Sequence, residues 1–365
     1  MEIKINKIIL DNAIELVAKA IDQNPFIPVM KGVLIEAEDN KITLIGSNGE
    51  ISIKHTINTS MDSSIITPGV ALIELNMFRN IVKKVDSDLQ IITNDNIMQI
   101  KSSDDIYTLN LYNNFDYPTI DFTIYGEMLK IKWQDLKDIA KNVWFAASQN
   151  EANLILCCVN ISAKNKQLKM LATDRYRYAE QILPIENDIN FNISLLSKNL
   201  KDLLSFEFNG DINLYISDHK IIFQIDNNII QSKIVEQIYQ DVSKIIPKDF
   251  PFTLTISKKE ISSLLNKASV IINENYNKIR LTIKNNVLTL SSSRDEIANV
   301  VLKTKNFIYN GDELKLLLNG KFLKDAISVF DDEINIYITK DHMRLVAKSD
   351  SNPNNIQLFT PQKGF

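Results

Sequence analysis

The spacing of apolar residues changes from helical to strand-like between residues 197 and 225. Leu200, Leu203 and Leu204 recur at positions i, i+3 and i+4, with lysines on the opposite side, which predicts a short amphipathic helix. After Asn209-Gly210 the period becomes two, and two apolar runs are separated by a polar turn. The stretch therefore predicts a helix followed by a β-hairpin.

The same pattern is found twice more in the chain. It returns between residues 320 and 347, where INIYI replaces INLYI at an offset of 122 residues (338 minus 216), and a weaker copy lies between residues 75 and 100. Each copy extends backwards to a short strand, an earlier amphipathic helix and a hairpin. These first helices are predicted at Lys7–Ile21, Lys132–Ala147 and Lys258–Ile271. One unit is thus repeated three times along nearly the whole chain.

Polar residues mark the ends of these elements. In the first turns of the first helices, or as their caps, we expect Asp11, Asp135 and Ser257. The turns of the hairpins that follow contain Asn40, Asn165 and Asn286. Asparagine tolerates the left-handed backbone that tight turns need.

Length and composition agree with three units. The chain has 365 residues, more than one hydrophobic core usually holds, and 45% of them are hydrophobic. Proline-containing stretches, YPTID and PKDFP, interrupt regular structure between the units. We predict an α+β fold with three repeated domains, each with two helices packed on antiparallel sheets, at residues 1–123, 124–249 and 250–365.

The sequence predicts a cytoplasmic protein. No apolar run approaches the roughly 20 residues of a membrane-spanning helix, so we expect no membrane contact, and MEIKINKIILDN lacks the apolar core and cleavage site of a signal peptide. The cysteines, Cys157 and Cys158, are adjacent, which favours inert packing thiols over a disulfide framework or a zinc site.

Positive charge is concentrated on helices although the net charge is −4. Lysine is a good helix former on solvated faces, and this explains any single one of them. The recurrence of Arg79, Lys201 and Lys324 at equivalent positions favours a cationic helix face that would contact phosphates without reading bases. The predicted DNA-facing set is Lys19, Arg79, Lys83, Lys84, Lys137, Lys141, Lys198, Lys201, Lys267, Lys321 and Lys324.

Three segments, read in order within the triplicated chain, suggest a family. LATDRYRY at residues 171–178, IYQDVSKIIPK at 238–248 and LFTP at 358–361 together resemble the bacterial sliding clamp, the β subunit of DNA polymerase III. The resemblance implies three clamp-type domains that form half of a closed ring, completed by a second, head-to-tail subunit around duplex DNA. It also implies a processivity factor without catalytic site or cofactor, and partners that include the polymerase III catalytic subunit, the clamp loader, and other polymerases and repair proteins.

The resemblance further implies a pocket between the second and third domains, into which partners insert a short apolar peptide. The matching positions are Leu156, Thr173, Arg175, Tyr176, Arg177, Tyr178, Lys244, Ile245, Leu358, Phe359, Thr360 and Pro361. Where the family typically reads ATDGHRLA, this chain has Arg175, Tyr176 and Tyr178, and it has Tyr239-Gln240-Asp241-Val242 for Phe-Pro-Asp-Tyr. These bulky residues are expected to narrow or reshape the pocket.

The ring interface implied by the resemblance joins the first domain of one subunit to the third domain of another. Its matching positions are Tyr107 and Leu109, on a predicted edge strand, and Val270 and Ile271, at a helix end. Without the resemblance, Val270 and Ile271 fit an ordinary core equally well.

Two other classes of protein stay open from the residues alone. A metal-dependent nuclease would need carboxylate clusters such as Asp104-Asp105 or residues 331–333, but both lie at predicted turns, where aspartate is common. The three histidines have no partner at ligand or triad spacing. A repeat scaffold that does not bind DNA is the other alternative, and it gives no reason for the repeated cations.

Overall fold

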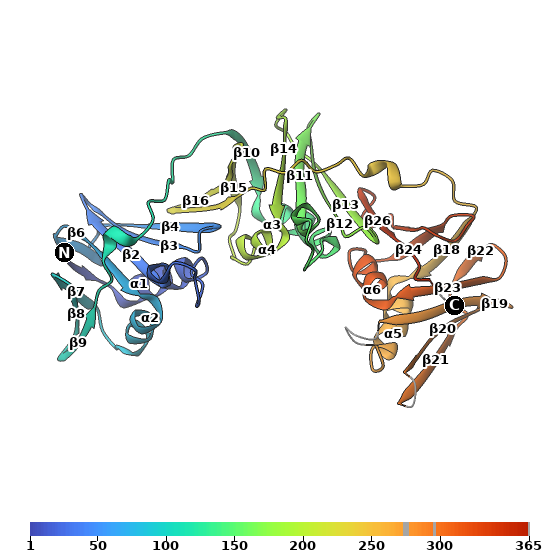
Figure 1. Cartoon of the computed structure of the whole chain (residues 1–365), viewed down its shortest axis with the longest axis horizontal. Coiled ribbons are helices and arrows are strands. Elements are labelled where there is room, and N and C mark those ends of the chain that lie inside the picture. The colour runs from blue at the N-terminus through green and yellow to red at the C-terminus, as the bar shows by residue number, and fades with distance from the viewer. Residues whose placement is uncertain (273–276, 295–296, 364–365) are drawn as a thin grey trace. The chain divides into compact units, whose positions relative to one another are not determined.

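The structure is a computed structural model that describes residues 1–272, 277–294 and 297–363. Antiparallel sheets and α-helices form two compact units, and the α+β prediction is confirmed (Figure 1). The first unit is Met1–Trp133 with Lys201–Ile234, and the second is Gln134–Leu200 with Val235–Phe365.

The first unit has two sheets. In spatial order, the five-stranded sheet contains β5 (Ser63–Thr67), β1 (Glu2–Ile5), β7 (Leu89–Asn94), β8 (Ile97–Ser102) and β9 (Asp105–Asn110). The eight-stranded sheet contains β10 (Glu127–Lys132), β15 (Asp211–Ile216), β16 (Lys220–Ile225), β17 (Asn228–Lys233), β4 (Ile51–Asn58), β3 (Lys41–Ser47), β2 (Gly32–Glu38) and β6 (Gly69–Glu74). Helices α1 (Lys7–Ala18) and α2 (Leu75–Lys84) pack against each other and against this sheet.

The second unit also has two sheets. The nine-stranded sheet contains β14 (Phe191–Leu196), β11 (Cys158–Lys164), β12 (Gln167–Thr173), β13 (Arg177–Pro184), β26 (Asn355–Phe359), β25 (Leu345–Lys348), β24 (Glu333–Ile338), β18 (Phe252–Ser257) and β22 (Ile308–Asn310). The four-stranded sheet contains β21 (Ala298–Thr304), β20 (Val287–Arg294), β19 (Lys278–Lys284) and β23 (Leu314–Asn319). Helices α5 (Lys258–Ala268) and α6 (Gly320–Ser328) pack together.

The remaining helices connect these sheets. Helices α3 (Trp133–Lys141) and α4 (Ser197–Leu203) each have residues in both units. Short 3-10 helices lie at Pro28–Lys31, Asn114–Asp116, Trp144–Ala146, Leu154–Cys157 and Ser243–Ile245. Amphipathic spacing explains the helix packing, because the apolar stripe of α5, including Ile261, Leu264 and Leu265, is buried in the core of the third repeat.

The repeat predicted from the sequence is present three times, and each repeat contains two three-stranded meanders. β2–β3–β4 corresponds to β11–β12–β13 and β19–β20–β21, while β7–β8–β9 corresponds to β15–β16–β17 and β24–β25–β26. Where two repeats meet, the last strand of one first meander pairs with the last strand of the next repeat's second meander. The first junction is β4 with β17, and the second is β13 with β26.

The predicted helix and turn signals are mostly confirmed. Ser257 caps α5 by accepting from the Glu260 N–H at 3.2 Å, and Asp135 lies in the first turn of α3. Asn165 and Asn286 have the left-handed backbone, with φ of 53° and 55°.

One of these predictions was wrong. The cap of α1 is Asn6, whose Oδ1 accepts from the Ile8 N–H at 2.9 Å, so Asp11 lies inside the helix. Asn40 lies in the turn of the first hairpin, as predicted, but the left-handed residue of that turn is Asp39, with φ of 51°.

Candidate functional site

The second junction brings together most of the predicted pocket residues. Strands β13 and β26 pair antiparallel, with Arg177 opposite Phe359 and Tyr178 opposite Leu358. Because side chains alternate along a strand, Arg177 and Phe359 project to one face of the nine-stranded sheet, and Tyr178 and Leu358 project to the other. The predicted set is therefore divided between the two faces of the sheet.

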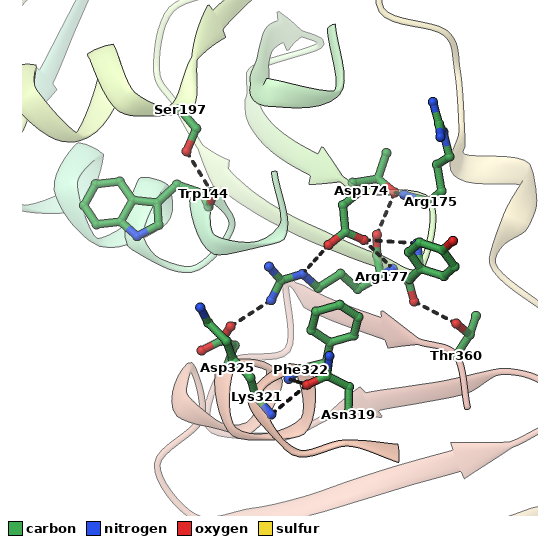
Figure 2. A network of polar contacts seen from close by, with 12 residues as sticks. Trp144, Asp174, Arg175, Arg177, Ser197, Asn319, Lys321, Phe322, Asp325 and Thr360 are labelled. Carbon is green, nitrogen blue, oxygen red and sulfur yellow. Dashed lines mark hydrogen bonds and ion pairs between the residues drawn. The ribbon is translucent and has the colours of Figure 1, made fainter. Parts of the chain in front are cut away.

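Arg177 is held on the helix face of the sheet. Its guanidinium donates to Asp174 Oδ2 at 2.9 Å and to Asp325 Oδ2, in α6, at 2.7 Å. It also stacks over the Phe322 ring, with 4.3 Å between the guanidinium carbon and the ring centroid. Figure 2 shows this arginine between the β12–β13 turn and α6. Arg177 thus joins the second repeat to the third and is not an open peptide ligand.

A buried amide network supports the same face. Gln181 is 5% exposed, and its Oε1 accepts from Asn142, Asn352 and Asn355 at 3.1, 2.9 and 2.8 Å. Gln357 donates to Asn355 Oδ1 at 2.8 Å and to the Asn142 carbonyl at 3.0 Å. Buried amides are stable only when they are paired, so this network favours the observed register of β13 and β26.

The opposite face carries an apolar cluster. Leu171, Tyr178, Val346 and Leu358 are buried there, and the segment at residues 239–250 packs over them. Burial raises the pKa of the Tyr239 phenol, and a backbone polar contact with Thr173 opposes the shift. This covering segment contains Ile245 and Lys244, of which Ile245 packs on the cluster and Lys244 is exposed. This face of the second junction is therefore apolar and covered by residues 239–250.

The other predicted pocket residues differ in exposure. Tyr176 is 63% exposed, and its carbonyl accepts from the Thr360 N–H at 3.0 Å. Arg175 has a left-handed backbone with φ of 78°, and its guanidinium lies 3.4 Å from Glu151. Leu156 and Pro361 are half-buried, and Thr173 is buried. Tyr176 and Arg175 therefore point outward and do not fill the cluster.

The predicted phosphate contacts differ in how available they are. In the first repeat, Glu15 of α1 accepts from Arg79 Nε at 2.5 Å and lies 2.8 Å from Lys83 Nζ. The Arg79 hydrogen bond is the main cause that lowers the pKa of Glu15. Lys19 Nζ lies 4.0 Å from the centroid of the Phe206 ring. These three cations therefore already have partners in the chain.

The remaining predicted cations are mostly at the surface. Lys137 is only 8% exposed, so its position does not fit the expected solvent-facing role. Lys201 is half-buried. The exposed ones are Lys84, Lys141, Lys198, Lys267, Lys321 and Lys324.

Of the strands that end a meander, β9 and β21 have only one partner among the described residues. Within the described residues, β9 pairs only with β8 and β21 only with β20. Tyr107 and Leu109 lie on β9, half-buried, as predicted for an edge strand. Val270 is 87% exposed just after α5, whereas Ile271 is 7% exposed and belongs to the core side.

Several residues at these strand edges and at the second junction were not predicted from the sequence. Ile106 on β9 is 61% exposed and Val301 on β21 is 59% exposed. The short apolar run VVL at residues 300–302 was the signal available for β21, but only the structure shows that this strand lies at an edge. The Arg177 partners Asp325 and Phe322 lie too far away in sequence to have been found by spacing.

In the described parts of the chain, no three His, Cys, Asp or Glu side chains are placed to hold a metal ion. None of the helices in these parts is long and apolar enough to cross a membrane.

Comparison with known proteins identifies the repeat. Family models of the DNA polymerase III beta subunit match in succession: the N-terminal domain at residues 1–121, the central domain at 130–241 and the C-terminal domain at 243–362. A beta sliding clamp of Mycoplasmopsis pulmonis is 32% identical over 359 residues, covering 96% of both chains. One from Staphylococcus epidermidis is 26% identical over 376 residues and covers 100% of both.

Solved structures give the same result. The DNA polymerase sliding clamp from Bacillus subtilis superposes with a TM-score of 0.94 at 25% identity, over 100% of both chains. The DNA polymerase III beta chain from Streptococcus pneumoniae gives the same values. The triplicated α+β unit is thus a DNA clamp fold. The chain belongs to the family of bacterial DNA polymerase III beta subunits, the beta sliding clamps.

Proposed function

We propose that this protein encircles duplex DNA in the bacterial cytoplasm as a head-to-tail dimer and serves as a processivity factor with no catalytic site or cofactor of its own. The observation that carries the proposal is the pattern of strand pairing between repeats. At each junction, the last strand of one repeat's first meander pairs with the last strand of the second meander in the following repeat. The strands of this type that remain are β21 and β9.

Pairing of β21 with β9 of a second copy would continue the same pattern. The two edges lie on different repeats, so the contact is heterologous, and repeated heterologous contacts either close a ring or extend a filament. The family implies closure with two subunits, that is, six domains. In that ring Tyr107 and Leu109 of one subunit would face the third repeat of the other, with Val270, Ile271 and β21 nearby.

Contact with DNA would come from the helices. Lys84, Lys198 and Lys324 are exposed on α2, α4 and α6, the second helix of each repeat. Lysines on corresponding helices attract phosphates without reading bases, and this gives weak, salt-dependent contact of the kind that permits sliding. Binding without sequence preference is therefore expected.

Partner proteins would bind at the second junction. The apolar cluster around Leu358, covered by residues 239–250, is the best-supported place for a short apolar peptide, with Thr360 and Tyr176 at its rim. Through such peptides the DNA polymerase III catalytic subunit, the clamp loader, and other polymerases and repair proteins would be tethered to DNA. The three-domain limits at residues 1–123, 124–249 and 250–365 remain part of this proposal.

Retention on DNA tests encirclement. The protein is assembled on nicked circular DNA with its clamp loader, and half of the sample is linearised with a restriction enzyme before gel filtration. A topological link predicts that the protein stays with circles and is lost from linear molecules, because it slides off the ends. Equal loss from both forms would contradict the proposal.

A further inference from the structure

The two repeat junctions carry equivalent rows of side chains on the face away from the helices. In the second junction the strand registers place Thr173, Tyr178 and Leu358 side by side on β12, β13 and β26. In the first junction the same registers place Ser47, Ser52 and Gln231 side by side on β3, β4 and β17. Tyr178 therefore occupies the position that Ser52 occupies in the first junction.

The small residues of the first junction leave space. A cavity of about 440 Å³ opens there, and Ser47, Ser52 and Gln231 are among the residues that line it. It is bordered on the other side by Pro118 and Ile120, from the segment that connects the first and second repeats. A cavity large enough for a ligand can thus form between this row of side chains and the connecting segment when the central residue of the row is small.

In the second junction the same position is filled. Tyr178 is fully buried, and its ring packs in the apolar cluster with Leu171, Val346 and Leu358. Its hydroxyl donates to Glu180 Oε2 at 2.5 Å. Glu180 is 7% exposed, and its carboxylate lies 3.9 Å from Lys169 Nζ.

This hydrogen bond holds the tyrosine inward. If the ring turned out toward solvent, the buried Glu180 carboxylate would lose its closest donor, and an unpaired buried carboxylate is unfavourable. Tyr176, two residues earlier, has no such restraint from a buried carboxylate and is 63% exposed. The two tyrosines that distinguish this segment from the family pattern therefore have different roles.

We propose that Tyr178 fills the deepest position of the partner-peptide pocket, so that this clamp selects peptides with a small apolar side chain at that position. This inference rests on the proposed function, because it concerns the same pocket. A large anchor side chain and the buried Tyr178 ring would compete for one volume, whereas a small anchor would lie above the ring, near Thr360 and Tyr176.

Peptide binding tests the proposal on the full-length chain. Two fluorescein-labelled hexapeptides, Ser-Leu-Ser-Leu-Xaa-Ser with Xaa as Ala or Phe, are titrated by fluorescence anisotropy. The wild-type protein should bind the Phe peptide less than about threefold more tightly than the Ala peptide. A Phe side chain that became fully buried would increase the affinity considerably more. In Tyr178→Leu, affinity for the Phe peptide should rise by about tenfold, which corresponds to about 1.4 kcal/mol.

Two variants serve as controls. Tyr178→Phe removes the hydroxyl but keeps the ring, and the more apolar phenylalanine ring should stay buried in the cluster, so this variant should keep the wild-type size preference. Tyr176→Leu changes the exposed rim tyrosine and should not produce the tenfold gain for the Phe peptide. Thermal unfolding of each variant verifies that it is folded.

The outcomes separate the inference from the proposed function. If the wild type already binds the Phe peptide about tenfold more tightly than the Ala peptide, the role of Tyr178 is refuted while the pocket stands. This comparison needs no variant, so it decides the question even if Tyr178→Leu does not fold. If neither peptide binds the wild type or Tyr178→Leu, both the inference and the peptide pocket are refuted.

Discussion

Glu15 makes the first repeat differ from the others, because it pairs with cations that would otherwise be available to phosphates. Arg79, Lys201 and Lys324 are equivalent by sequence, but Arg79 donates to Glu15, and Lys83 lies 2.8 Å from the same carboxylate. In the first repeat, part of the cationic face is therefore neutralised by a carboxylate of the neighbouring helix. Because the Glu15 side chain is 38% exposed, solvent screens this pairing and its contribution to stability is small.

Replacement of Glu15 should strengthen contact with DNA. Glu15→Gln removes the negative charge beside Arg79 and Lys83, so we expect tighter binding to a short linear duplex at low salt and a steeper salt dependence, by up to about two phosphate contacts. The free energy of unfolding at pH 7 should fall by less than about 1 kcal/mol. Fluorescence anisotropy and urea unfolding measure the two effects.

The dependence of stability on acidic pH gives a further test of Glu15. The pKa of Glu15 is lowered in the folded protein, so the carboxyl adds stability above its unfolded pKa, about 4.3, and loses it as the pH falls through the folded value. The stability difference between wild type and Glu15→Gln should therefore shrink below about pH 4. Glu38→Gln, at the exposed end of β2, is a control for loss of charge alone, and an equal gain in DNA affinity there would contradict the assignment.

At the scale of elements, strand edges decide what the repeats can do. β4 and β13 are covered by β17 and β26, whereas β9 and β21 have open edges in the described chain. Open edges with exposed apolar residues tend to pair with another chain. The exposed Ile106 and Val301 lie on these two strands. The same property that makes an edge a hazard would here provide the subunit contact.

A charge placed on this edge should prevent dimer formation. Ile106→Asp on β9 leaves the fold intact, because the side chain is 61% exposed, but it would bury a carboxylate in the proposed interface. We expect a monomer by sedimentation equilibrium at concentrations where the wild type is a dimer. The matched control is Ile66→Asp, on β5 at the opposite edge of the same sheet, with 51% exposure. A dimeric Ile106→Asp protein would exclude β9 from the contact.

At the scale of the whole molecule, net charge and DNA binding have to be reconciled. The chain carries 45 acidic and 41 basic residues, so its overall field opposes DNA. Local cations on helices supply weak attraction, and a closed ring needs no more than that, because it is held by topology. Affinity and retention are then separate properties of the assembled protein.

Salt should separate these two properties. Raising the salt concentration from about 50 to 200 mM should abolish most direct binding to linear duplexes, because counterion release weakens phosphate contacts. Clamps already assembled on circular DNA should remain bound over the same range, provided the dimer stays intact. Gel filtration of the circular complex at each salt concentration measures this. Parallel loss from circles and linear duplexes would indicate binding by charge alone.

The amino-acid sequence by itself determined the triplicated unit and its elements. Apolar spacing of three and four residues, followed by spacing of two, depends on neighbouring residues only, so the helices at α4 and α6 and the hairpins after them could be predicted. Through their resemblance to a family, the segments LATDRYRY, IYQDVSKIIPK and LFTP also indicated a site between the second and third repeats. Only the tertiary structure decided that Arg177 and Tyr178 project to opposite faces, that Glu15 pairs with Arg79, and that β9 and β21 lie at open edges. Each of these depends on which distant segments pack together, such as Arg177 with Asp325 or Glu15 with Arg79, and local spacing carries no information about such contacts.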